Sequence, residues 1–313
     1  MHTNIILHHF IELTMADIKR KSELHENNLH KGRYNIKALV QSHPELDQYI
    51  IANKVGEKSV NFSDSKAVKS LNNALLKHHY DLEYWNIPEG YLCPAVPGRA
   101  EYIHHIADLL ESKTTKVRLL DIGTGASLVY PIIASHQYNW SVIGTDIDQE
   151  VLEYAKTIIN KNKRLQSSVE LRRQKNTDDI LHGIIEDNEH FDLTMCNPPF
   201  YSSSEEAIKN NTRKNKNLHG KHSKKKDRNF SGKANELWTE GGEKQFLKDM
   251  VYQSQKYASQ VSWFTTLVSR EAYIPAIKKS IESVNATRAK VINMGTGNKM
   301  SRIVAWQSKT AKP

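Results

Sequence analysis

The sequence has few cysteines and no long apolar run, and both absences exclude classes of protein. Only Cys93 and Cys196 occur in 313 residues. They are too few for a disulfide framework or a cysteine zinc site, so we expect reduced thiols and no metal. No segment approaches the roughly 18 to 20 consecutive apolar residues of a membrane span, and the N-terminal stretch lacks a clear cleavage site. We therefore expect a soluble, cytoplasmic protein.

Acidic residues are also in deficit, and one segment accounts for the whole deficit. The chain has 44 Lys and Arg against 35 Asp and Glu, a net charge of +9. Residues 209–233 contain ten of the basic residues and one acidic residue, so the rest of the chain is balanced. A charged segment with so few apolar residues predicts a mobile loop. It is either a solvated loop or a contact for a polyanionic partner.

The spacing of apolar residues divides the chain into two parts. Residues 1–93 have helical and loop signals, including a helix that begins at Ser63 or Asp64, and predict a mainly helical extension. In residues 94–313, strands and helices alternate, which predicts an α/β domain with a mostly parallel seven-stranded sheet and helices on both faces. Strands are expected at 116–123, 140–147, 168–174, 191–197, 261–269, 289–295 and 301–308. Helices are expected at 126–136, 149–162, 178–185, 241–258 and 270–284.

A glycine loop follows the first of these strands. LLDIGTGAS places Asp121, Gly123 and Gly125 between a strand and a helix, where open sheets of this class bind ligands. The glycines let a ligand approach the backbone, and Asp121 can accept hydrogen bonds from it. The third glycine of a dinucleotide fingerprint is missing, which disfavours NAD. Asp146 ends the next strand and can accept both hydroxyls of a ribose, whereas Asp148 is the expected helix N-cap.

The segment MCNPPFYSSSEEA follows the fourth strand and contains Asn197, Pro198, Pro199 and Phe200. An Asn-Pro-Pro-aromatic motif at a strand end is typical of methyltransferases that act on a planar nitrogen. The amino group of adenine is a poor nucleophile because its lone pair is delocalised into the ring. The Asn197 side-chain oxygen and the Pro198 carbonyl can accept its two N–H groups, in a turn stiffened by the prolines. Phe200 can stack on the base, a contact worth roughly 1 to 3 kcal/mol.

With these motifs, the chain resembles the bacterial 23S ribosomal RNA adenine-N6 methyltransferase family (RlmF type). That family is related to a eukaryotic methyltransferase-like enzyme that methylates a spliceosomal small nuclear RNA. The resemblance is carried by LHENNLHKGRYN, LNNALLKHHYDLEYWNIPEGYLCPAVPGRAEYIHHIADLL, LLDIGTGAS, MCNPPFYSSSEEA, WTEGGEKQF and GNKMSRIVAWQS. These segments cover most of residues 25–308. One departure is HENNLH, at a place where the family is expected to have a more arginine-rich string such as HPRNRH.

The resemblance implies a Rossmann-like class I methyltransferase that uses S-adenosyl-L-methionine. It places these residues around the cofactor: Arg99, Gly123, Ser127, Asp146, Thr177 and Asn197. Asp121 and Gly125 join them from the glycine loop, and Asn197 to Phe200 hold the adenine. RNA contacts are expected at Lys31 and Arg33 and, in the basic segment, at Arg213, Lys224, Lys225 and Lys226.

The implied function is N6-methylation of a single adenine in 23S ribosomal RNA, free or in a large-subunit precursor, by a monomer. Two other classes of function remain open. The same chemistry could act on a small nuclear RNA, on adenine in DNA or on a glutamine of a protein. Alternatively, the chain could be an RNA-binding assembly factor without turnover. The intact motif and the carboxylates Asp121 and Asp146 favour an enzyme.

Overall fold

The computed structural model describes residues 24–53, 55–110, 116–203, 206, 238–296 and 299–308. The basic segment 209–233, with Arg213, Lys224, Lys225 and Lys226, lies outside these residues. Within them, no helix combines the length and the apolar composition that crossing a membrane requires.

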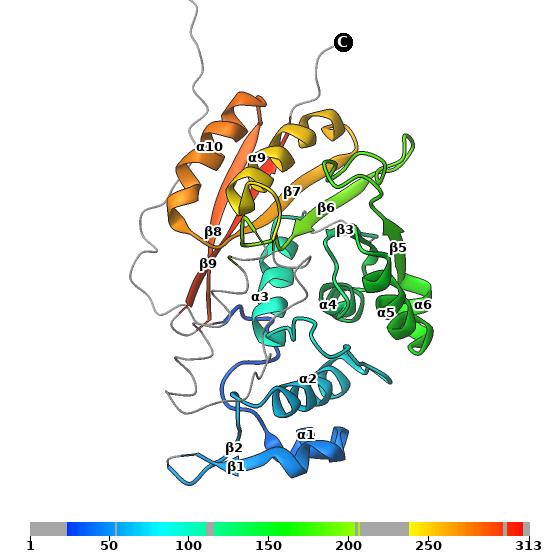
Figure 1. Ribbon diagram of the computed structural model, residues 1–313, viewed down its shortest axis with the longest axis vertical. Helices are drawn as coiled ribbons and strands as arrows, with labels where there is room; N and C mark the ends of the chain where they lie inside the picture. The colour runs from blue at the N-terminus through cyan, green and yellow to red at the C-terminus, as the bar shows by residue number, and fades with distance from the viewer. Residues whose placement is uncertain are drawn as a thin grey trace, which may run out of the picture.

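One seven-stranded sheet forms the centre of the molecule, as Figure 1 shows. Its strands are β3 (Arg118–Ile122), β4 (Ser141–Asp146), β5 (Val169–Arg173), β6 (Phe191–Cys196), β7 (Val261–Val268), β8 (Arg288–Thr296) and β9 (Lys299–Gln307). The order across the sheet is β5-β4-β3-β6-β7-β9-β8, and only the pairs that include β9 are antiparallel. The predicted mostly parallel sheet is confirmed. That β9 lies between β7 and β8 was not predicted.

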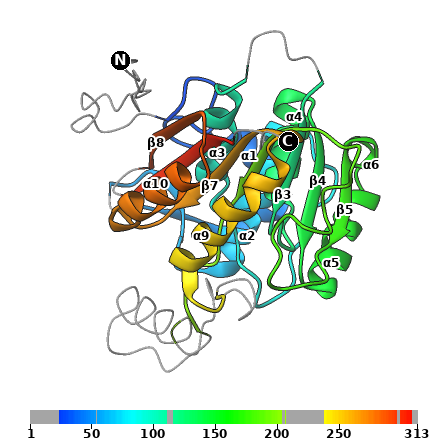
Figure 2. The same ribbon diagram turned by 90° about the horizontal axis from the view of Figure 1, so that it is seen from above.

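Helices cover both faces of the sheet (Figure 2). One face carries α3 (Val96–Ala107), α4 (Val129–Tyr138), α5 (Gln149–Asn160) and the short α6 (Lys163–Ser168); the other carries α9 (Gly242–Ser254) and α10 (Ile274–Ser283). Successive strand residues point to opposite faces, so each inner strand contributes to two hydrophobic cores. Leu119 belongs to the core under α3 and α4, and its neighbour Leu120 belongs to the core under α9 and α10.

The N-terminal extension packs against the α3 and α4 side of the sheet. It contains α1 (Ile36–Ser42), the 3-10 helix η2 (Pro44–Tyr49), an antiparallel pair of β1 (Ile50–Ala52) and β2 (Lys58–Val60), and α2 (Ser65–Tyr80). The carboxylate of Asp64 accepts a hydrogen bond from Lys66 N, so Asp64 is the N-cap of α2. Side chains of α2 join the same hydrophobic core as Leu119. The division into residues 1–93 and 94–313 stays a prediction.

The segment 178–185 forms turns, so the helix predicted there is wrong. Gly183 has a φ of +76°, a left-handed conformation that interrupts a helix. The apolar side chains of the segment are nevertheless buried under α9: Ile180, Leu181, Ile184 and Ile185. Their spacing therefore reflects burial on the sheet rather than a helical face, and apolar spacing alone does not separate the two.

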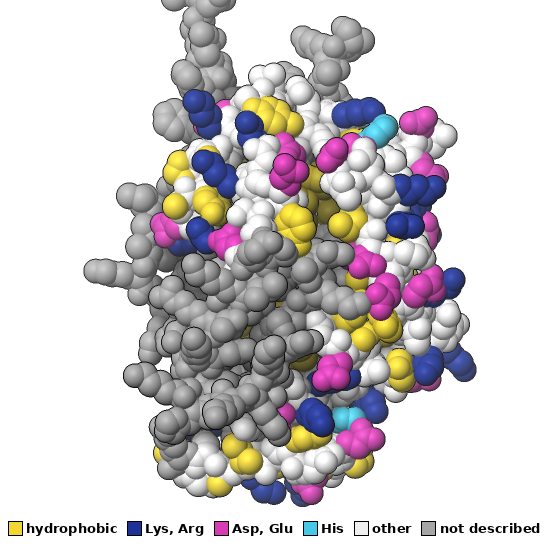
Figure 3. All heavy atoms as spheres, viewed as in Figure 1, with side chains coloured by type: hydrophobic (Ala, Val, Ile, Leu, Met, Phe, Trp, Pro, Cys, Tyr) yellow, Lys and Arg dark blue, Asp and Glu magenta, His cyan; other side chains and the backbone are white. Residues whose placement is uncertain are grey.

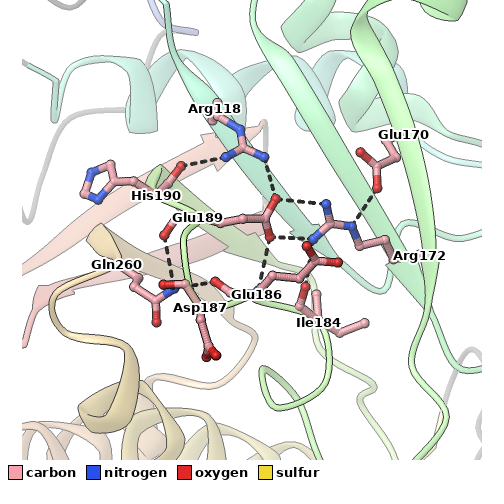
Figure 4. Close-up of polar contacts among 9 residues, drawn as sticks. All are labelled: Arg118, Glu170, Arg172, Ile184, Glu186, Asp187, Glu189, His190 and Gln260. Atoms are coloured by element: carbon pink, nitrogen blue, oxygen red, sulfur yellow. Dashed lines mark hydrogen bonds and ion pairs between the residues drawn. The ribbon is translucent and has the colours of Figure 1, made fainter.

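A cluster of charges fixes the connection between β5 and β6, as Figure 4 shows. The Glu189 carboxylate lies between Arg118 of β3 and Arg172 of β5, at 2.8 and 2.6 Å. Arg172 also donates to the carbonyl of Ile184. Hydrogen bonds from Arg172 and Arg118 lower the pKa of Glu189 to about 2, so it stays ionised. The cluster thus anchors the connection that carries Thr177 to the functional site.

Candidate functional site

A pocket lies at the carboxyl ends of β3, β4 and β6, where the strand order reverses direction. It brings together eight of the residues expected from the sequence: Arg99, Gly123, Gly125, Ser127, Asp146, Thr177, Asn197 and Pro199. Three expected residues do not line it: Asp121, Pro198 and Phe200. Asp121 is fully buried beneath the pocket, at the end of β3. The roles of all eleven residues stay predictions at this point.

The glycine loop after β3 lies tightly over the next strand. Gly123 and Gly125 have φ values of +73° and +68°, which residues with a Cβ adopt only with strain. Thr124 N donates to the carbonyl of Thr145 at 2.8 Å. A Cβ on Gly144 would lie 3.0 Å from Thr124 Oγ1, so this glycine permits the close approach. The result is a backbone cradle that lines the pocket at Gly123 and Gly125.

Asp146 holds this loop and also faces the pocket. Its Oδ2 accepts from Gly125 N at 3.2 Å and its Oδ1 from Asp148 N at 3.1 Å. Asp148 in turn accepts from Glu150 N at 2.8 Å and caps α5, as expected. Burial raises the pKa of Asp146 above its usual value, an effect that the backbone hydrogen bonds partly offset. Asp146 therefore lines the pocket and does not cap α5, and its role as a ligand stays a prediction.

Asp121 is an unusual carboxylate. It has no exposed surface, and neither of its oxygens has a hydrogen bond of normal geometry with a described residue. Burial, reinforced by the charge of Asp146, raises the pKa of Asp121 to about 7, and the neighbouring Thr124 hydroxyl offsets only part of this. A cation bound in the pocket would favour the ionised forms of both carboxylates.

Arg99 brings a positive charge into the pocket lining. Its Nη1 donates to the Tyr130 hydroxyl at 2.6 Å, and the guanidinium lies 5.3 Å from the centre of the Tyr130 ring. Burial raises the pKa of Tyr130 to about 12, so the phenol stays neutral. Arg99 makes no ion pair with a carboxylate among the described residues, and its other N–H groups suit a ligand carboxylate.

Asn197 follows directly on β6, and the chain then turns along the pocket. Tyr201 forms a parallel bridge with Trp238, and Thr239 N donates to the carbonyl of Tyr201 at 3.0 Å. Trp238, Thr239 and Phe246 line the pocket beside Asn197 and Pro199. They extend the apolar part of the site to segments far from the motif in sequence.

Several pocket residues were missed by the sequence analysis, among them Trp238, Phe246, Gln174 and Asp179. Trp238 lies in WTEGGEKQF, which supported the family resemblance, but nothing in its spacing marked it as a site residue. Trp85 is a further contributor, because its indole N–H donates to the carbonyl of Ser127 at 2.8 Å. The N-terminal extension therefore holds the glycine loop in place.

The expected RNA contacts of the extension lie away from the pocket lining. Lys31 Nζ donates to the carbonyl of Glu26 at 2.7 Å, and Arg33 forms an ion pair with Glu57. On the face shown in Figure 3, acidic and basic side chains are interspersed among the coloured residues, with no large patch of one sign. The role of Lys31 and Arg33 stays a prediction.

A group of His25, His105 and Asp108 has ligand atoms within 4.8 Å of one another, as in some metal sites. Nitrogen atoms of both histidines already have polar partners within the protein. His25 Nδ1 accepts from Asn27 N, which leaves the proton on Nε2, and this Nε2 lies 2.9 Å from Asp108 Oδ2. His105 Nε2 lies 3.3 Å from Glu101 Oε1. The group is explained by hydrogen bonding, and the absence of a metal stays a prediction.

Comparison with known proteins relates most of the chain to one protein family. The sequence profile of a family described as RNA methyltransferase matches residues 18–309. A curated relative from Vibrio campbellii, named ribosomal RNA large subunit methyltransferase F, is 43% identical over 91% of this chain and 80% of its own length.

Two solved structures are similar in fold over nearly the whole chain. The human METTL16 catalytic domain in complex with MAT2A 3′UTR hairpin 1 is 26% identical, with a TM-score of 0.78 over 93% of this chain and 99% of that one. The N-terminal domain of human METTL16 in complex with SAH is 25% identical, with a TM-score of 0.72 over 91% and 99%.

Proposed function

Because the chain belongs to the RNA methyltransferase family, among the ribosomal RNA large subunit methyltransferases F, it is an S-adenosylmethionine-dependent ribosomal RNA methyltransferase, and we propose that it methylates N6 of a single adenine in 23S ribosomal RNA. The observation that carries the proposal is the position of Asn197 and Pro199 beside Asp146 and the glycine loop in one pocket. We propose that the chain acts as a monomer. The cytoplasm, where ribosomal RNA is made and assembled in bacteria, is the expected compartment.

The pocket fits S-adenosylmethionine on the evidence of its own residues. The cradle at Gly123 and Gly125 admits a ligand close to the backbone, and Asp146 can accept the two hydroxyls of a ribose. Arg99 can hold the carboxylate of the amino-acid part. Asp146 in the pocket lining and Asp121 beneath it suit a ligand that carries a sulfonium and an ammonium group, because a bound cation favours the ionised forms of both carboxylates. Ser127 and Thr177 complete the polar lining.

The chemistry of the acceptor depends on Asn197 and Pro198. S-adenosylmethionine supplies an electrophilic methyl group when bound. We propose that the Asn197 side-chain oxygen and the Pro198 carbonyl accept the two N–H groups of the adenine, which keeps the lone pair on N6. With S-adenosylmethionine held by Arg99, Asp146 and the glycine loop, Asn197 and Pro198 would hold N6 facing the methyl group, and the proton that N6 loses on methylation would pass to water.

The apolar side of the pocket would exclude water from the reacting nitrogen. Pro199, Trp238 and Phe246 line this side. Phe200, which lies outside the lining, keeps its expected role of stacking on the base. Expulsion of water strengthens the hydrogen bonds to Asn197 and Pro198, because fixed dipoles replace solvent around the amine.

The direct test is methyl transfer to unmethylated 23S ribosomal RNA made by transcription in vitro. Labelled donor and the purified chain should place the label in N6-methyladenosine, as judged by nucleoside analysis. A small nuclear RNA, duplex DNA and a glutamine-containing protein serve as competing substrates. Label in any of these in preference to 23S RNA, or in another nucleoside, would overturn the proposal.

The variant Asn197→Ala tests the assigned role of the motif. The side chain is assigned to the reacting amine, so its loss should lower kcat by about 100-fold or more and leave the donor Kd within about twofold. Calorimetry with S-adenosylhomocysteine measures the second quantity. An unchanged kcat would remove Asn197 from the mechanism.

A further inference from the structure

The end of β6 separates from β7 just before the Asn-Pro-Pro-Phe motif. The parallel ladder between these strands stops at the pair Thr194 and Phe264, whereas β6 stays paired with β3 up to Ile122 and Cys196. The last residue of β6 is therefore paired on one side only. Its backbone N–H needs another acceptor, because Cys196 is buried.

The hydroxyl of Tyr102, from α3, fills this gap. Cys196 N donates to Tyr102 Oη at 3.3 Å, and Tyr102 Oη lies 2.9 Å from Thr265 Oγ1 of β7. Thr265 Oγ1 donates to the carbonyl of Thr194 at 2.7 Å. Since the Thr265 proton is used in this way, the proton of Tyr102 is left for Thr265 Oγ1 or for the carbonyl of Cys196, which lies 3.3 Å from Tyr102 Oη. A chain of two hydroxyls thus bridges β6 and β7 where their backbones no longer pair.

Both side chains of this bridge are buried in the protein core. Tyr102 and Thr265 have no exposed surface. Burial holds the pKa of Tyr102 well above its usual value, so its hydroxyl keeps the proton that the bridge requires. The ring of Tyr102 also packs at right angles against Tyr130, the residue that holds Arg99.

One turn of α3 therefore touches both halves of the site. Arg99 lines the pocket, and Tyr102, three residues later on the same helix, contacts the residue that precedes Asn197. Movement of the hydroxyl would change where the chain leaves β6, and Asn197 is the first residue after that point.

We propose that Tyr102 is a positioning residue for methyl transfer, whose hydroxyl fixes the end of β6 outside the β7 ladder and so sets the place of Asn197. The proposal rests on the proposed role of Asn197 in holding the target amine. It assigns Thr265 as the second member of the same device. Tyr102 itself does not touch substrate or cofactor in this scheme.

The test uses Tyr102→Phe, which keeps the ring and removes the hydroxyl, and Thr265→Val as a second variant. Tyr138→Phe is the matched control, because the Tyr138 hydroxyl also contacts α3, at His104 Nδ1 (2.7 Å), but lies away from β6. We expect Tyr102→Phe to lower kcat by about tenfold or more, with KM for RNA and Kd for S-adenosylhomocysteine within about twofold. The double variant should lose no more than the stronger single variant, because both act through one bridge.

Two measurements separate a positioning role from a general loss of stability. Thermal unfolding should shift by a similar amount in Tyr102→Phe and in Tyr138→Phe, while only the former loses turnover. Amide hydrogen exchange in the peptide that contains Cys196 should become faster in Tyr102→Phe alone. An unchanged kcat with unchanged exchange, or an equal loss of kcat in the control, would overturn the proposal. If the unmodified chain does not methylate 23S RNA, the proposed function fails, and the exchange measurement still decides whether Tyr102 fixes the strand end.

Discussion

At the scale of single residues, Asp121 makes stability depend on pH. Its pKa is raised to about 7 by burial, whereas an Asp carboxyl in an unfolded chain titrates near pH 4. Between about pH 4 and 7 the folded state thus keeps a proton that the unfolded state has released. The contribution of this group to the free energy of unfolding therefore falls as pH rises through that window, and it stays low above about pH 7.

The variant Asp121→Asn should remove this dependence. The amide stays neutral, so the variant should gain stability over the original chain at pH 8, by roughly a few kcal/mol at most, and differ little from it near pH 4. Thermal unfolding of both proteins, measured from pH 4 to pH 8 without donor, tests the expected gain in stability at pH 8 and the expected similarity near pH 4. Equal pH dependence in the two proteins would show that Asp121 does not titrate in this window.

Asp146 and Asp148 are two residues apart but have different tasks. Asp146→Ala should weaken S-adenosylhomocysteine by the roughly 1.5 to 3 kcal/mol of a charge-assisted hydrogen bond. Asp148→Ala is the control, because it removes the α5 cap at a cost of about 1 kcal/mol in stability and should leave donor affinity unchanged. Calorimetry measures the affinities. A loss of less than about threefold in Asp146→Ala would make Asp146 a structural residue that only holds Gly125.

Site residues could be predicted from the sequence where local order alone places them. Asp146 and Asn197 end strands, and parallel strands bring their carboxyl ends to one edge of a sheet, so their meeting follows from the pattern. Tyr102 and Trp238 could not be found in this way. Tyr102 reaches β6 across 94 positions of sequence, and only the packing of α3 on the sheet determines that contact.

At the scale of elements, features set by local sequence could likewise be predicted, whereas features set by long-range packing could not. All seven strands were predicted within about two residues, because buried strands have a strong apolar signal. The turns at 178–185 were predicted as a helix because buried turns and helices share apolar spacing. The place of β9 between β7 and β8 depends on long-range pairing, about which the sequence of one strand says nothing.

Asn162 joins the N-terminal extension to the helices on the α4 side of the sheet. Its Oδ1 accepts from Glu83 N and Tyr84 N at 2.8 and 3.0 Å, and its Nδ2 donates to the carbonyls of Tyr84 and Ile158. Asn162→Ala leaves these backbone groups without their partner and should cost about 1 to 3 kcal/mol. Urea denaturation measures the loss.

The exposed Asn160, at the end of α5, gives the matched control for this variant. Asn160→Ala should change stability by less than about 0.5 kcal/mol. Because Trp85 of the same extension holds the carbonyl of Ser127, Asn162→Ala should also weaken S-adenosylhomocysteine. Donor affinity that is unchanged would show that the glycine loop keeps its shape without this anchor.

At the scale of the whole molecule, the net positive charge belongs to one segment of the sequence. The chain outside residues 209–233 has no net charge, and the described surface in Figure 3 mixes both signs. A polyanion is therefore attracted chiefly by the basic segment. Tyr201 and Trp238 are paired with each other and lie on either side of this segment in sequence, and Trp238 lines the pocket together with Asn197. The described residues that precede and follow the segment in sequence are thus close to the site where the target base must enter.

Removal of residues 209–233 tests whether this segment binds RNA. Each phosphate that a Lys or Arg neutralises releases counterions, with a slope of about −0.7 in log affinity against log salt for a single strand. Deletion should therefore weaken RNA binding and flatten the salt dependence, and leave the donor Kd nearly unchanged. The pairing of Tyr201 with Trp238 lets the shortened connection close without distortion of the pocket.

A full-length variant with the ten basic residues changed to Gln is the control for length, and it should behave as the deletion does. If both variants keep the original affinity and salt slope, the segment is a solvated insertion, and RNA must be held by the extension around Lys31 and Arg33.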